Sequence, residues 1–228
     1  MNSPKLLILE TSGRQGQVGL ALGNHLIDQE VLDGGRQHAR DLAPSVELLL
    51  RRQQWHPREI QGVIVGRGPG SFTGLRVGII SAMAYAYATD CALLAVDTFH
   101  TIAIQVPATC GQVAVLGDAQ KQELYIQPFV HREGAWHPSG EIVILPFEAW
   151  LAQHAPQVWV TGPGLARWES QLPSTMLLID PALRQPTLSA TLDLGWTRYL
   201  REERDSLYSV EPLYLRASAA ERQWSGRT

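Results

Sequence analysis

Acidic and hydroxyl side chains at the ends of two predicted strands are the first candidates for chemistry. Glu10, Thr11 and Ser12 follow the apolar run 6–9, and Asp118 follows a second apolar run. Carboxylate and hydroxyl oxygens in such places can hold a phosphate and its Mg²⁺. The alternative is that each acid lies at the solvated end of a hairpin. We therefore treat these four residues as weak candidates for nucleotide binding.

A glycine-rich segment, Gly-Arg-Gly-Pro-Gly-Ser-Phe-Thr-Gly-Leu-Arg-Val-Gly, occupies residues 66–78 between a predicted strand and a predicted helix. Glycines let backbone N–H groups converge on an anion, and a helix N-terminus adds partial positive charge. The segment lacks the lysine of the P-loop, however, and Pro69 and Phe72 interrupt a G-x-G-x-x-G pattern. Pro69 also breaks the nucleophile pattern G-x-S-x-G around Ser71. The alternative is a tight turn in which Ser71 or Thr73 caps the helix.

Histidine spacing gives no indication of a metal site. The chain has seven histidines, and no two of them are three, four or five residues apart, as helical zinc ligands are. We expect neither a bound metal nor a cofactor.

The elements that position these residues repeat in order along the chain. Apolar runs and their periodicity predict a β-β-β-α-β-α-β order in the first half and a shorter version in the second. The first half has predicted strands 6–10, 17–22, 26–32, 62–65 and 93–96 and predicted helices 41–52, 75–89 and 98–105. The second half has predicted strands 113–116, 123–130, 141–145 and 158–161 and predicted helices 146–154 and 188–203. Pro44, which a helix tolerates in its first turn, sets the start of the first long helix near Asp41. The sequence therefore predicts an α/β fold made by internal duplication, with lobes at 1–106 and 107–228.

The predicted helix 75–89 has two kinds of apolar face. Gly78, Ala82 and Ala86 recur every four residues and form a groove that another helix can approach closely. Tight packing inside the lobe is the alternative use of such a groove. The other faces offer more apolar surface than one sheet contact requires, through Val77, Ile80, Tyr85 and Tyr87. The helix is therefore a candidate for binding an external helical partner.

Composition excludes several classes of protein. Of 228 residues, 45% are hydrophobic and 18% are charged, which excludes a disordered chain. A net charge of -3 does not provide the broad positive field of an autonomous nucleic-acid binder. The apolar stretch 77–88 is shorter than the roughly 20 residues that span a bilayer. Two widely separated cysteines and the absence of an export signal predict a cytoplasmic protein.

The sequence resembles one family in five places. The segment 66–78 is similar to the signature of the TsaB (YeaZ) family, bacterial proteins required for threonylcarbamoyladenosine in tRNA. Glu10-Thr11-Ser12 stands where that family has Asp-Thr followed by Ser or Ala. The other matches are His38 with Leu42 and Pro44, Asp118-Ala119 with Glu123-Leu124-Tyr125, and the motif 212–216. The resemblance is close over 5–125, thin over 130–205, and returns at 212–216.

This resemblance implies an actin-like ATPase (ASKHA) fold with duplicated β-β-β-α-β-α lobes and a reduced C-terminal lobe. It implies a non-catalytic subunit that pairs with TsaD, the enzyme that transfers the threonylcarbamoyl group to the adenosine beside the anticodon. TsaE would join as an ATPase, tRNA would be contacted only through the complex, and free chains would pair as homodimers. It implies no membrane association.

The same resemblance places the partner interface on the two long helices. The expected interface residues are Leu42, Val46, Leu49, Phe72, Leu75, Gly78, Ala82, Tyr85 and Ala86. A different class of function remains as the alternative. In it the chain is an enzyme by itself, either an actin-like ATPase that uses Glu10 and Asp118 or a metallopeptidase.

Overall fold

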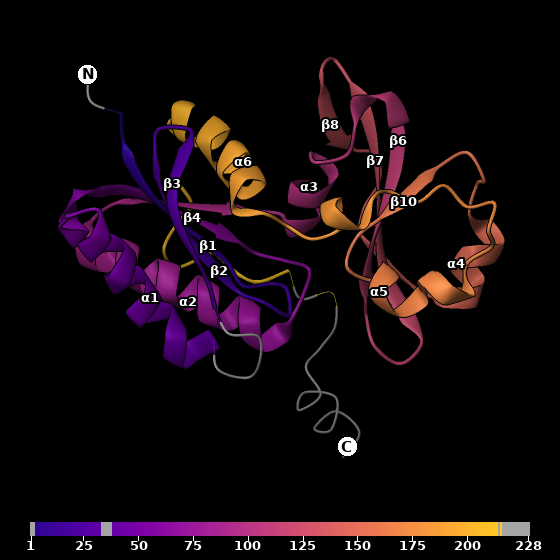
Figure 1. The fold of residues 1–228 in the computed structure, drawn as a ribbon, viewed down its shortest axis with the longest axis horizontal. Helices are drawn as coiled ribbons and strands as arrows, with labels where there is room; N and C mark the ends of the chain where they lie inside the picture. Colours follow the sequence, from indigo (N-terminus) through magenta and orange to yellow (C-terminus); the bar gives the residue numbers. More distant parts are fainter. Residues whose placement is uncertain (1–2, 33–37, 214, 216–228) are drawn as a thin grey trace.

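Two five-stranded mixed sheets form the framework of the chain, one in each of two lobes (Figure 1). The structure is a computed structural model that describes residues 3–32, 38–213 and 215. The first sheet has the order β3-β2-β1-β4-β5. The second has the order β10-β6-β7-β8, with β9 also paired to β7.

The first sheet takes its strands from the N-terminal part of the chain. These strands are β1 (Lys5–Glu10), β2 (Gln17–Leu22), β3 (His25–Val31), β4 (Ile60–Gly66) and β5 (Ala92–Val96). Strand β1 runs antiparallel to β2 and parallel to β4. Helices cover both faces of β1 and β4, which explains why both read as continuous apolar runs. Strand β1 therefore lies at the centre of the lobe, and Glu10 at its end is enclosed.

Helices α1 (His38–Arg52) and α2 (Phe72–Thr89) cover one face of this sheet, and α6 (Leu188–Leu200) covers the other (Figure 1). Side chains of a strand alternate between its two faces. Leu7 and Leu9 accordingly belong to the cluster that contains the buried residues of α1 and α2, whereas Leu6 and Ile8 pack with Leu188 of α6 and its neighbours.

The second sheet is smaller and has shorter helices. Its strands are β6 (Gln112–Asp118), β7 (Glu123–Arg132), β8 (Ala135–Pro138), β9 (Val143–Pro146) and β10 (Trp159–Thr161). Helix α3 (Thr98–Ala103) packs on one face, and α4 (Phe147–Gln153) and α5 (Leu165–Trp168) pack on the other. Four short 3₁₀ helices complete the described elements, at Pro57–Glu59, Ala108–Cys110, Glu169–Gln171 and Pro181–Leu183.

The two sheets repeat one strand order. Strands β3-β2-β1-β4 of the first sheet correspond to β8-β7-β6-β10 of the second, with the same parallel and antiparallel neighbours. A parallel bridge between Val160 and Leu178 takes the place that β5 has in the first sheet. The predicted duplication therefore agrees with the strand order, and the arrangement supports an actin-like fold.

Two helices pack on the sheet of the other predicted lobe. Helix α3 was assigned to the first lobe, but Phe99 and Ile102 are buried with Val113 and Val115 of the second sheet. Helix α6 was assigned to the second lobe, but Leu192 is buried against Ile64 and Leu94 of the first sheet. The chain therefore crosses between the lobes twice, once before α3, which covers the second sheet, and once before α6, which covers the first.

Several element bounds differ from the prediction, among them those of α1, α2 and β8. Helix α1 begins at His38, so Pro44 lies in its second turn rather than its first, and the side chain of His38 lies outside the described residues. Helix α2 begins at Phe72, three residues earlier than expected. Strand β8 occupies a segment for which no strand was predicted.

The described part of the chain holds no membrane-spanning helix. Among those residues, no helix combines the length and the apolar content that a bilayer crossing requires.

Candidate functional site

Glu10 ends β1 inside the protein, with 1% of its surface exposed. One carboxylate oxygen accepts a hydrogen bond from the Ser12 backbone N–H at 2.8 Å. The other lies 3.5 Å from the Thr98 hydroxyl, at the start of α3. Burial raises the pKa of Glu10 above its usual 4.5, and the hydrogen bonds from Ser12 and Thr98 oppose this rise only in part. The carboxyl therefore joins β1 to α3 and carries its charge at an energetic cost.

Glycines of the segment 66–78 allow this close packing. A Cβ on Gly66 would stand 2.0 Å from a Glu10 oxygen, and one on Gly70 would stand 2.5 Å from the Ser12 carbonyl oxygen. A Cβ on Gly74 would stand 2.1 Å from the carbonyl oxygen of Thr11. Any side chain at these positions would displace the turn that follows β1. The space in which a glycine-rich loop can hold a phosphate is therefore filled by this chain's own residues.

Hydrogen bonds close the same turn. The Thr11 hydroxyl donates to the Gly74 carbonyl at 2.8 Å, and the Ser71 N–H donates to the Ser12 carbonyl at 2.7 Å. The Ser71 hydroxyl also accepts from the Gly74 N–H at 3.2 Å, which makes Ser71 the N-cap of α2. Of the two predicted capping residues, the structure therefore uses Ser71.

The nucleotide-binding candidates do not form one accessible site. Glu10, Thr11 and Ser12 are buried, and the partners described above belong to the chain itself. Asp118 is exposed at the end of β6, where it accepts from the Gln120 N–H and pairs with Arg167 at 3.1 Å. A nucleotide phosphate cannot reach the first three residues unless the turn after β1 moves.

The second lobe repeats this packing in a simpler form. A Cβ on Gly162 would stand 2.3 Å from the Leu116 carbonyl oxygen, and the Gly164 N–H donates to that same oxygen at 3.0 Å. Each lobe thus places a glycine loop, which follows a parallel strand, against the end of its first strand. Close packing against the first strand explains why both loops contain glycine.

Most residues of the expected partner interface lie inside the first lobe. Seven of its nine residues are buried: Leu42, Val46, Leu49, Leu75, Gly78, Ala82 and Ala86. Tyr85 is half-buried and donates its hydroxyl to the Pro57 carbonyl at 2.9 Å. Phe72 remains exposed, at 37%. The Gly78-Ala82-Ala86 groove therefore receives the chain's own sheet, with Thr11 against Gly78.

The opposite side of α2 carries an exposed stripe that includes large apolar side chains. We call this the α2 stripe, and its members are Phe72, Arg76, Ile80, Ala84 and Tyr87. Ile80 is 63% exposed and Tyr87 is 74% exposed. The Arg76 guanidinium lies 4.2 Å from the centre of the Phe72 ring. On the neighbouring α1, Leu48 is 43% exposed. The members of the stripe are three or four residues apart in the sequence, a spacing that places them on one side of a helix.

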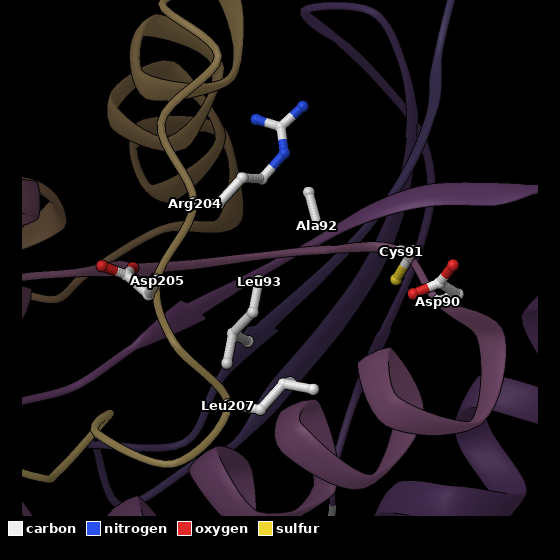
Figure 2. Close-up of a pocket in the computed structure, with 7 residues that line it drawn as sticks. All are labelled: Asp90, Cys91, Ala92, Leu93, Arg204, Asp205 and Leu207. Atoms are coloured by element: carbon white, nitrogen blue, oxygen red, sulfur yellow. The ribbon is translucent and has the colours of Figure 1, made fainter.

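A shallow pocket of about 260 Å³ opens at the edge of the first sheet (Figure 2). Asp90, Cys91 and Leu93 line it from the end of α2 and from β5, and Arg204 and Leu207 line it from the segment after α6. Burial raises the pKa of the Cys91 thiol. The pocket lies at the edge strand β5, whereas Glu10 ends the central strand β1.

Possible metal ligands are dispersed. Among the described residues, no group of three or more His, Cys, Asp or Glu side chains is close enough to hold a metal ion. His100 instead packs against Phe129 in the second lobe, with ring centres 5.6 Å apart, and burial lowers its pKa.

Comparisons with known proteins agree on one family. A sequence model described as TsaD, tRNA N6-adenosine threonylcarbamoyltransferase, matches residues 5–154. The tRNA threonylcarbamoyladenosine biosynthesis protein TsaB of Escherichia coli K12 is 28% identical over 200 residues, which cover 84% of this chain and 86% of that protein. TsaB of Bacillus subtilis is 22% identical, and the match covers 96% of this chain and 97% of that protein. A solved structure of YeaZ from Pseudomonas aeruginosa superposes on this chain with a TM-score of 0.76 at 25% identity. The superposition covers 93% of this chain and 100% of the YeaZ chain.

Proposed function

This chain belongs to the TsaB (YeaZ) family, within the wider family that the TsaD model describes, and we propose that it is a non-catalytic subunit of tRNA threonylcarbamoyladenosine biosynthesis. In this role it pairs with TsaD and supports transfer of the threonylcarbamoyl group to tRNA. We further propose that TsaE joins the pair, that tRNA is contacted only through the complex, and that the complex acts in the cytoplasm.

The α2 stripe is the observation that carries the proposal. Ile80 and Tyr87 expose more than half of their surfaces on a helix whose opposite side is fully packed. Contiguous exposed apolar surface of this kind is typical of a protein interface, and Tyr and Arg are enriched at interfaces. Neighbouring Leu48 on α1 extends the apolar surface. We therefore place the TsaD contact on the exposed sides of α1 and α2, and homodimers would compete for the same surface.

The closed turn after β1 supports the non-catalytic part of the proposal. Glu10 is the carboxylate that the ATPase alternative requires, and it is enclosed by Gly66, Ser12 and Thr98. A catalytic carboxylate must reach its substrate or the metal bound to it. Glu10 instead links strand, loop and helix by accepting hydrogen bonds from Ser12 and Thr98.

Two variants with matched exposure test the proposed surface. Ile80, at 63%, and Leu200, at 62%, are equally exposed, but Leu200 lies on α6, on the other face of the sheet. Ile80→Glu should weaken binding to purified TsaD by a hundredfold or more, because it would bury an unpaired charge in an apolar contact. Leu200→Glu should bind as tightly as the unaltered chain. Binding is measured by calorimetric titration, and folding by thermal unfolding of each variant.

The outcomes separate the claims. Equal loss with both variants would reject the α2 stripe as the binding surface. Full tRNA modification by TsaD and TsaE without this chain would reject the subunit role. A charge at Ala82 would not be a suitable test, because Ala82 is fully buried and its replacement would destabilise the lobe.

A further inference from the structure

The segment after α6 stays on the first lobe and follows the outer edge of β5. Residues 203–213, which we call the strap, begin after Glu202, whose φ of 57° reverses the chain. β5 is an edge strand of its sheet, so its outer N–H and C=O groups need partners from outside the sheet. Figure 2 shows Asp205 and Leu207 of the strap beside Leu93 of this strand.

Asp205 is the first anchor of the strap. Its backbone N–H donates to the Leu93 carbonyl at 2.9 Å, and its carboxylate accepts from the Ala95 N–H at 2.7 Å. Arg198 of α6 pairs with both carboxylate oxygens, at 2.8 and 3.0 Å, and donates to the Ala95 carbonyl as well. This network closes the sheet edge with side chains instead of a sixth strand.

Leu207 and Val210 are the second anchor. Both are half-buried and pack on the hydrophobic cluster that lies between the sheet and helices α1 and α2. The strap therefore starts on the α6 side of the sheet and crosses its edge to the α1 and α2 side.

Leu213 is the third anchor, and it holds the glycine-rich segment. Its backbone N–H donates to the Arg67 carbonyl at 2.9 Å. Arg67 is held from the other side as well, because its own N–H donates to the Val96 carbonyl at 2.9 Å and its guanidinium pairs with Asp97. Five residues after Arg67, the chain enters α2 at Phe72, the first member of the α2 stripe.

We propose that the strap is a positioning element, which sets the affinity for the partner by holding the glycine-rich segment and the start of α2 in place. This inference rests on the proposed function. The proposal gives a role to Leu213, which belongs to the family motif 212–216 but does not lie on the proposed interface. The strap acts through Arg67 and does not need to touch the partner. Tyr208, which is 89% exposed in the middle of the strap, provides the means to test that distinction.

Three single variants test the proposal. Leu213→Pro removes the N–H that binds Arg67, and Leu213→Ala keeps it. Tyr208→Ala removes a strap side chain that is 89% exposed and leaves the anchors in place. The dissociation constant for TsaD is measured by titration, and amide hydrogen exchange is followed over residues 66–76 of the free chain. A tRNA modification assay records the concentration of this chain that gives half-maximal rate, and the rate at saturation.

Loss of one hydrogen bond should raise the dissociation constant of Leu213→Pro about two- to tenfold. Exchange over 66–76 should become faster, and the half-maximal concentration should rise while the saturating rate stays unchanged. Leu213→Ala and Tyr208→Ala should match the unaltered chain in all three measurements.

Wild-type affinity or wild-type loop exchange in Leu213→Pro would overturn the proposal. So would a loss of affinity in Tyr208→Ala equal to that in Leu213→Pro, because the strap would then act by direct contact. If the unaltered chain failed to bind TsaD, the proposed function would fail, whereas loop exchange in the free chain would still report on the strap.

Discussion

A Cβ built on Gly78 of α2 would stand 2.1 Å from the hydroxyl oxygen of Thr11, which follows β1. The two residues are 67 positions apart in the sequence, and their contact fixes how closely α2 approaches the sheet. The Thr11 hydroxyl already donates to the Gly74 carbonyl, so it cannot turn away without losing that bond. The small residues of α2 therefore serve internal packing.

Gly78→Ala should consequently destabilise the protein. Alanine favours a helix by about 1 kcal/mol over glycine, but overpacking at this contact costs about 1–3 kcal/mol and breaks the Thr11 hydrogen bond in addition. We expect a net loss of about 2 kcal/mol in the free energy of unfolding, measured by urea titration. Ala84→Ser, on the exposed side of the same helix, should change it by less than about 0.5 kcal/mol. A Gly78→Ala chain as stable as the original would contradict the assigned packing.

Glu10→Gln should make stability less dependent on pH. The pKa of Glu10 is raised in the folded state by burial, so its contribution is fully present below about pH 4.5 and is lost as pH rises through the folded-state pKa. Glutamine keeps an acceptor for the Ser12 N–H and carries no charge. The variant should therefore gain stability relative to the original chain as the pH rises.

Urea unfolding at pH 5 and pH 8 measures that difference. Glu148→Gln is the control, because Glu148 is an exposed carboxylate on α4. An advantage of Glu10→Gln that shrank toward pH 8 would show that Glu10 gains more from its hydrogen bonds than it loses by burial.

The sequence predicted most element types, because β1, β4 and β5 are short apolar runs between turn residues. It could not predict which side of α2 is buried, since that helix is apolar nearly all the way round. Helical periodicity identifies a buried face only where a polar face contrasts with it. The contrast in α2 is between small and large residues. The small ones are expected at the interface, but they pack inside the lobe, with Gly78 against Thr11.

The sequence also could not predict that α6 packs on the first sheet. Leu188 and Leu192 form an apolar face that would fit either sheet, and only the crossing of the chain decides between them. The enclosure of Glu10 depends on Gly66 and Thr98, which are 56 and 88 residues away. Spacing along the chain carries no information about such contacts.

Tyr87→Ala should weaken partner binding without changing stability. Tyr87 is 74% exposed in the free chain, so its removal leaves no cavity, whereas a tyrosine at an interface commonly contributes more than 1 kcal/mol. We expect the dissociation constant for TsaD to rise about tenfold. Leu48→Ala on α1 should give a smaller rise, since it removes less apolar surface. Unchanged affinity in both variants would place the contact elsewhere.

Asp205→Asn should destabilise the protein more than the loss of an exposed ion pair does. Burial acts to raise the pKa of Asp205, but hydrogen bonds from Arg198 and the Ala95 N–H outweigh it, and the pKa lies below its usual 3.8. The stabilisation is therefore present above about pH 3.8 and is lost as pH falls through the folded-state pKa. Asparagine keeps an acceptor for the Ala95 N–H but loses the charged pair with Arg198. We expect a loss of about 1.5–3 kcal/mol at pH 7 that diminishes toward pH 3.

Glu47→Gln is the matched control for that loss. Glu47 pairs with Arg51 at 2.6 Å, a shorter distance than in the Asp205 pair, but its side chain is 63% exposed against 25% for Asp205. Water screens the exposed pair, so its loss should cost about 0.5 kcal/mol or less. Urea titrations at pH 3 and pH 7 measure both variants. Equal losses at pH 7 would mean that the closed edge of β5 gives Asp205 no advantage over a surface carboxylate, and the strap would then lack its first anchor.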